Sequence, residues 1–432
     1  MLGQLPGMLR QALANPGSRS AFVVVNLAVN ALFLARSYVA MLVFDYWQLG
    51  LVAVLQTVMA LVAALHFGLL NGGYRLLCSE AGESARGINT AVYTFIALLG
   101  GVSLLAGAAY LVFGTWSVVT GFALLGVVAG MLTLLRSWIT NQLLATGQLT
   151  QLNGANINSV LVSLLPLALI PWAPLPACVA SILVQPLAFA LLAWRTRPEL
   201  RPRALGFSGP LFRALLHSGF LVFMTGVLLQ LIAQAERWYV VKYLGLESLG
   251  RLYLAIMFVT VFQLVPASLD NVVLPRLVRD YEAGNAVAVR RELRRLFALC
   301  AGYCLFALLA VWLLAAPVVQ LALPRYVDDL QYVYLVLPGL ILFTLAGPFG
   351  IVFNVLIRYK AFMVAYGGGF LLALAAFGFA AWHGGALDLR DVVLTRSTVL
   401  AVMAALLVAL YLRTVRFFPA LALHRAPDVQ PS

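Results

Sequence analysis

Two arginines lie inside apolar segments that are long enough to cross a lipid bilayer, Arg36 and Arg237. Each is followed, after one intervening residue, by a Tyr-Val pair that begins at Tyr38 or Tyr239. A charged side chain in hydrocarbon costs about 3 kcal/mol or more, so such residues face a polar interior or a partner. The planar guanidinium recognises phosphate and carboxylate through paired hydrogen bonds. The two arginines therefore predict a shared cationic interior that accepts an anionic cargo or head group.

Snorkelling is the alternative interpretation of Arg36. Its position is about 12 Å from the outer end of its apolar segment at helical rise, which is the edge of the distance that an arginine side chain spans to reach an interface.

Polar residues accompany both arginines and are candidates to line the same interior. Asn26 and Asn30 are four residues apart and share one helix face. Such amides hydrogen-bond between helices as readily as they bind cargo. The tyrosines could stack on sugar rings or anchor at the membrane interface. Beyond the two arginines, the candidate binding residues are Asn26, Asn30, Tyr38, Gln56, Gln230, Gln234, Glu236, Tyr239, Asn141 and Asn354.

An amide-rich stretch, 141–158, separates two apolar segments. It fits either a hydrogen-bonding vestibule for sugars or a solvated loop, and we favour the loop.

The composition predicts an all-α, polytopic membrane protein. Hydrophobic residues make up 63% of the 432 positions and charged residues 10%, against about 25% in a soluble domain. A spanning helix needs about 20 mostly apolar residues. Runs such as 98–113 are apolar on nearly every side, whereas membrane barrels alternate in polarity. We expect twelve transmembrane helices, at 21–44, 49–72, 89–113, 118–135, 159–170, 177–194, 220–244, 249–272, 296–316, 332–353, 361–382 and 392–411.

The 28 lysines and arginines fall mostly in alternate connections of this scheme. By the positive-inside rule those connections and both termini are cytoplasmic. The opposite side carries only Lys242, Arg251, Arg325, Arg390 and Arg396. This orientation signal accounts for the net charge of +13 without a nucleic-acid partner. We also expect an amphipathic surface helix in the basic connection after residue 272.

A weak internal repeat divides the chain into two halves. The segment from Gly50 to Asn71 aligns without a gap with the segment from Gly250 to Asn271. Six spans in each half give the halves the same orientation, as in transporters with parallel repeats. The predicted division is a cytoplasmic arm (1–20), a six-helix bundle (21–194), a basic cytoplasmic linker (195–219), a second six-helix bundle (220–412) and a cytoplasmic tail (413–432).

Nothing in the sequence indicates an enzyme or a metal site. It contains no phosphate-binding loop, no HExxH and no GxSxG motif. The four cysteines lack metal-ligand spacing. We expect no catalytic residue, no metal and no cofactor.

Several segments resemble the Wzx-type O-antigen flippases of the MOP exporter superfamily, which also contains the MATE exporters. They are Ala35-Arg36 through Asp45-Tyr46-Trp47-Gln48-Leu49-Gly50, Gly68-Leu69 through Arg75, Tyr239 through Gly250-Arg251-Leu252-Tyr253, Leu274-Pro275-Arg276-Leu277 and Pro324-Arg325-Tyr326. One departure is the first turn, where Leu49 rather than tyrosine precedes Gly50.

The resemblance implies two six-helix bundles around a cationic central cavity in the bacterial inner membrane. It implies that a lipid-linked oligosaccharide on undecaprenyl pyrophosphate is moved by alternating access, for the biosynthesis of O-antigen, lipopolysaccharide or another surface polysaccharide. Arg36 and Arg237 would be the cavity cations, and membrane lipids and polysaccharide-assembly proteins the partners. The alternatives are a MATE-like cation-coupled exporter, for which Glu236 is the in-span acid, and a membrane-embedded glycan polymerase or ligase.

Overall fold

All the regular structure in the described part of the chain is helical. The structure is a computed structural model and describes residues 19–78, 82–202, 204–356, 358–385 and 387–416. Most of the predicted arm and tail lies outside these ranges. The chain divides into two compact units, between Gln230 and Leu231.

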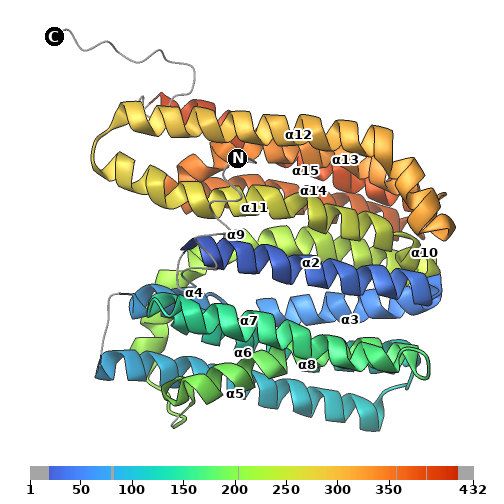
Figure 1. Cartoon of the computed structure of the whole chain (residues 1–432), viewed down its shortest axis with the longest axis horizontal. Coiled ribbons are helices and arrows are strands. Elements are labelled where there is room, and N and C mark those ends of the chain that lie inside the picture. Colours follow the sequence, from blue (N-terminus) through green and yellow to red (C-terminus); the bar gives the residue numbers. More distant parts are fainter. Residues whose placement is uncertain (1–18, 79–81, 203, 357, 386, 417–432) are drawn as a thin grey trace. The chain divides into compact units, whose positions relative to one another are not determined.

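The first unit contains the helices drawn from blue to green in Figure 1, most of which run alongside one another, whereas the start of α9 crosses them. Asp45 begins α3 with a capping box, in which its side chain accepts from Gln48 N at 2.7 Å and the Gln48 side chain accepts from Asp45 N at 3.2 Å. The elements are α2 (Arg19–Val43), α3 (Tyr46–Ala64), α4 (Leu69–Leu77), α5 (Glu83–Phe113), α6 (Val118–Ala145), α7 (Leu149–Leu164) with η2 (Leu165–Leu169), α8 (Pro174–Thr196), η3 (Pro198–Leu200) and the first part of α9 (Gly209–Tyr239).

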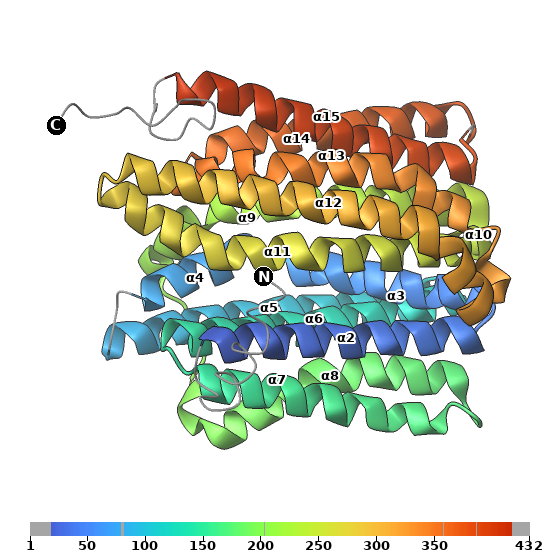
Figure 2. The same cartoon turned by 45° about the horizontal axis from the view of Figure 1, so that its top comes forward.

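The second unit contains the rest of α9 and the helices drawn from yellow to red in Figure 2. A π-helical turn, η4, follows α9 directly. Asp388 caps the last helix by accepting from Asp391 N at 2.8 Å. The further elements are η4 (Val240–Leu244), α10 (Gly245–Arg251), α11 (Tyr253–Glu282), α12 (Ala286–Ala322), η5 (Pro324–Tyr326), α13 (Leu330–Val355), α14 (Tyr359–Trp382) and α15 (Leu389–Val415).

The all-α membrane fold predicted from composition is confirmed. In the described residues, 11 helical segments are long and apolar enough to cross a bilayer. The apolar part of α11, Tyr253–Leu269, takes the place of the remaining predicted span. The twelve-helix scheme is consistent with this set.

The predicted repeat is matched by the helix packing inside each unit. The second span of each unit packs on the fourth span of that unit. In the first unit these are α3 and α6, and in the second unit α11 and α13. The fourth packs on the sixth as α6 on α8 and as α13 on α15. The fifth packs on the sixth as α7 on α8 and as α14 on α15. Two halves that repeat one packing pattern are what parallel repeats require.

Two connections differ from the predictions for a common reason. The helix α6 continues to Ala145 and α7 begins at Leu149, so the stretch expected to be a solvated loop is mostly helical. Three of its amides, Gln142, Asn153 and Asn156, are buried. The prediction of a separate surface helix after residue 272 is also wrong, because the arginines of that connection lie at the adjoining ends of α11 and α12. In each case polar residues lie on helices longer than the apolar run.

The second predicted span is broken at residues 65–68, between α3 and α4. Phe67 and Gly68 both have positive φ, 47° and 90°. Close packing holds the break, because a Cβ at Gly219 of α9 would lie 2.0 Å from Gly68 O and 2.3 Å from Gly72 N. The backbones of α4 and α9 can approach this closely only where all three residues are glycine.

Replacing Gly219 with alanine should destabilise the first unit. The added methyl group overlaps backbone atoms that cannot move independently, and such overpacking costs about 1–3 kcal/mol or more. Thermal unfolding of the purified protein in detergent measures the effect. Gly226→Ala is the matched control on the same helix, because a Cβ there meets nothing within 4 Å. Equal melting temperatures for the two variants would contradict the close contact.

Candidate functional site

Arg136 joins three helices in the interior of the first unit. From α6, its Nη1 donates to Gln185 Oε1 on α8 at 3.2 Å, and its Nη2 donates to Asn156 Oδ1 on α7 at 3.1 Å. The guanidinium carbon lies 5.2 Å from the ring centroid of Phe189, also on α8. Asn156 and Gln185 are each 5% exposed. A cation, two neutral amides and an aromatic face therefore meet at one buried point.

The polar partners of Arg136 are uncharged. In the part of the chain that the structure describes, no carboxylate forms an ion pair with it. Neutral hydrogen bonds offset only part of the desolvation cost of a buried charge, which amounts to several kcal/mol. Two further polar atoms on α8, Gln185 Nε2 and Ser181 Oγ, are buried and have no hydrogen-bond partner among the described residues. The first unit thus has a net positive, incompletely satisfied interior.

Arg36 lies on α2 of the same unit and is half-buried. Its guanidinium carbon is 5.1 Å from the ring centroid of Phe33, one turn earlier. It is also within electrostatic reach of the Cys178 thiol on α8. Since α2 packs on α7, the side chain faces other helices of its unit rather than lipid alone.

The second unit contains a cluster of two arginines and one acid. Arg396 Nη1 on α15 lies 3.0 Å from Glu236 Oε2 on α9, and the two side chains are 13% and 3% exposed. Arg237 is within electrostatic reach of both charges and of Tyr253. Glu236 balances only one of the two cations, so this interior also carries excess positive charge. The π-helical turn that follows is a feature often found at functional sites.

Two other candidates of the second unit are buried. Tyr239 is 5% exposed, with its ring against Tyr243 and Phe377 at centroid distances of 4.9 and 5.3 Å. Its hydroxyl accepts from Leu387 N at 3.3 Å. Gln234 is 3% exposed, and its Oε1 has no hydrogen-bond partner among the described residues. Tyr239 is thus a packing residue in this conformation, whereas Gln234 retains an unused acceptor.

The remaining candidates are half-buried and spread over several helices. The amide of Asn30 donates to Asn26 O at 2.8 Å, so it is used within α2. Asn141 on α6 donates to Leu70 O at 3.2 Å, just after the break in the second span. The others are Tyr38 on α2, Gln56 on α3, Gln230 on α9 and Asn354 near the end of α13.

Two arginines of these clusters, Arg136 and Arg396, are not among the site residues that the sequence predicts. The charge distribution predicts a cytoplasmic connection for Arg136 and an outer helix end for Arg396, yet both lie within long apolar helices. Apolar residues that follow each arginine indicate that the span continues past it. They are Trp138 and Ile139 after Arg136, and Val399 and Leu400 after Arg396. Arg36 and Arg237 are therefore not the only cations within the spans.

Comparison with solved structures identifies the fold. A multidrug resistance MATE family transporter of the MOP superfamily, in an inward-facing conformation, superimposes with a TM-score of 0.72 at 12% identity, covering 94% of this chain and 100% of that one. The fold is that of the MOP superfamily transporters. The lipid II flippase MurJ, in an inward closed conformation, gives a TM-score of 0.65 at 14% identity, over 92% of this chain and 87% of that one.

A third similar structure is a MOP superfamily transporter from Pyrococcus furiosus, described by a binding pocket of reverse polarity that suggests a different function. It gives a TM-score of 0.62 at 13% identity, over 92% of this chain and 95% of that one. No family model and no curated protein matches the sequence. At these identities the likeness establishes the fold alone.

Glu236→Gln should destabilise the protein more than Arg396→Gln does. Removing the acid leaves Arg237 and Arg396 buried together and repelling each other, whereas removing Arg396 leaves Glu236 with Arg237 beside it. Breaking a buried ion pair costs about 3–5 kcal/mol when one charge is left alone. Thermal unfolding in detergent measures the difference.

Glu199→Gln is the control for that comparison. It breaks the exposed pair with Arg197, at 3.3 Å, and should change stability by about 0–1 kcal/mol. If Arg396→Gln proved the more damaging change, Arg237 would not act as a second counter-ion of Glu236.

Proposed function

We propose that this protein is a flippase that moves a lipid-linked oligosaccharide, of the undecaprenyl-pyrophosphate type, across the bacterial inner membrane by alternating access. Such a cargo serves surface polysaccharide biosynthesis, including O-antigen and lipopolysaccharide. Both termini are cytoplasmic in this proposal, and polysaccharide-assembly proteins are its partners.

The observation that carries the proposal is the positive balance of the interior charges. Arg36 and Arg136 lie within the spans of the first unit, and Arg237 and Arg396 within those of the second. Among the described residues the buried carboxylates are Glu236 and Asp329, and Asp329 lies in the turn before α13. Cationic sites in hydrocarbon are costly and mark the route of an anionic group. A pyrophosphate supplies that group.

The same charges disfavour a MATE-like exporter of cationic compounds. A cationic cargo requires a buried carboxylate that is able to pair with it. Glu236 is the in-span acid that the alternative relied on, and it already pairs with Arg396 at 3.0 Å. The fold alone does not separate the two functions, since the similar structures include both a multidrug transporter and a lipid II flippase.

Each unit has its own arginine suited to an anionic group of the cargo. Arg36 and Arg237 pair with pyrophosphate or acidic sugar oxygens through their guanidinium forks. Half-buried amides, Gln56 and Gln230 among them, are suited to sugar hydroxyls because they both donate and accept.

Arg36→Ala and Arg237→Ala should each reduce surface glycan by about tenfold or more, because a hydrogen-bonded charge contributes roughly 1.5–3 kcal/mol. The measurement is rescue of a deletion strain, read as surface glycan and as accumulated lipid-linked intermediate, with membrane insertion checked by immunoblot. Arg75→Ala, which removes an exposed cation of α4, is the control and should restore export. Full export by both interior variants would exclude their role as cargo-binding cations.

A further inference from the structure

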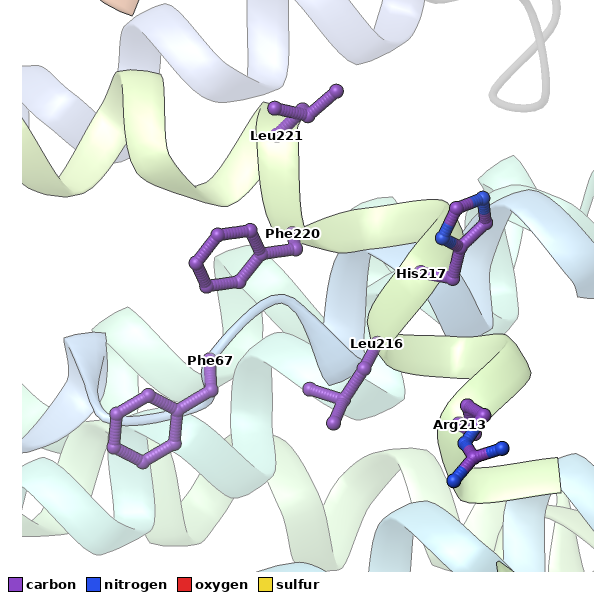
Figure 3. Close-up of a pocket in the computed structure, with 6 residues that line it drawn as sticks. All are labelled: Phe67, Arg213, Leu216, His217, Phe220 and Leu221. Carbon is purple, nitrogen blue, oxygen red and sulfur yellow. The ribbon is translucent and has the colours of Figure 1, made fainter. Parts of the chain in front are cut away.

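An apolar cavity of about 590 Å³ opens on the first unit, between the break in the second span and the start of α9. Figure 3 shows its six lining residues: Phe67, Arg213, Leu216, His217, Phe220 and Leu221. In this view the rings of Phe67 and Phe220 lie on one side, and Arg213 and His217 on the other. The cavity therefore has an apolar end and a basic end. We refer to it as the α4–α9 groove.

The apolar wall of the groove is exposed but held in place. Phe67 is 46% exposed, Phe220 44% and Leu221 38%. Behind them, Phe223 packs against Phe67 and Phe220 at centroid distances of 6.2 and 6.3 Å. The contact of Gly219 with Gly68 and Gly72 fixes one helix against the other. The groove is thus preformed, and its apolar surface is available to a ligand.

The basic end of the groove lies next to the basic connection that precedes α9. Arg213 is in the first turns of α9, directly after the basic segment that carries Arg195, Arg197 and Arg201. The positive-inside rule places this end of α9 at the cytoplasmic interface. Leu221 lies eight residues further along α9, after the bend near Phe220 that Figure 3 shows, on the apolar part of the groove. A cation at the interface beside an exposed apolar surface matches a lipid with an anionic head group.

We propose that the α4–α9 groove binds an anionic phospholipid of the cytoplasmic leaflet. The phosphate accepts hydrogen bonds from the exposed Arg213 guanidinium and from the imidazole N–H of His217. One acyl chain lies against Phe67, Phe220 and Leu221. Basic sites between helices at the cytoplasmic side are typical places for anionic lipid head groups. Because Phe67 is in the break between α3 and α4, the lipid contacts both that break and the start of α9.

This site is separate from the interior cations proposed to bind the cargo. The two proposals can fail independently, because one is measured as lipid retained by the purified protein and the other as surface glycan in cells that carry the Arg36 or Arg237 variant.

Native mass spectrometry of the purified protein tests the site. The protein is equilibrated with mixed micelles that contain phosphatidylglycerol and phosphatidylcholine, and the lipids retained are counted. The wild type should retain one phosphatidylglycerol in preference to phosphatidylcholine. Arg213→Gln should lower that retention about tenfold, the loss expected for a charge-assisted contact. Leu221→Trp, which adds an indole to the groove, should lower the retention of both lipids.

Arg195→Gln is the matched control, since it removes an exposed cation of the same basic segment outside the groove and should leave retention unchanged. Both Arg213 and Leu221 are exposed, and thermal unfolding verifies that each variant is folded. Equal retention of phosphatidylglycerol by wild type and Arg213→Gln would overturn the proposal. So would equal retention of the two lipids by the wild type, or displacement of phosphatidylglycerol by an equimolar polyprenyl phosphate, which would assign the groove to a carrier lipid.

Discussion

A guanidinium within a membrane-spanning helix has to be solvated by the protein itself, and this requirement shapes the interior of both units. In the first unit Arg136 draws amide oxygens from two further helices, Asn156 on α7 and Gln185 on α8. In the second unit Arg396 pairs with Glu236 across α15 and α9. The two solutions differ in kind, because amides leave the positive charge in place whereas a carboxylate cancels it. Each interior nevertheless remains positive, since Arg237 lies beside the second pair.

The internal repeat explains why the halves share their packing and yet differ in these details. Corresponding helix pairs pack in each unit, so the framework is common to both. The second span is broken in the first unit, where Gly68 and Gly72 meet Gly219, but α11 is continuous in the second. The positions aligned with His66, Phe67 and Gly68 are Pro266, Ala267 and Ser268. The glycine contact is therefore a property of the first unit alone, and it creates the α4–α9 groove there.

Apolar runs, turns and the distribution of basic residues were enough to predict the helices and their number, because bilayer thickness imposes a length on every span. Helix ends were less predictable. The stretch after Arg136 reads as a polar loop, but Gln142, Asn153 and Asn156 are buried against neighbouring helices, which a single sequence does not reveal. The break at Phe67 depends on Gly219, about 150 residues away in the chain. The sequence predicts only part of the site. Arg36, Glu236 and Arg237 are recognisable as charges within apolar runs, whereas the roles of Arg136 and Arg396 depend on contacts with other helices.

The central claim is that the positive interior serves an anionic, lipid-linked cargo. Its most direct test is translocation by the purified protein in proteoliposomes, with a fluorescent oligosaccharide on polyprenyl pyrophosphate in one arm and a fluorescent organic cation in the other. The charges of the two units predict protein-dependent movement of the pyrophosphate-linked substrate and none of the cation. Transport of the organic cation, with the pyrophosphate-linked substrate remaining in its original leaflet, would contradict the account.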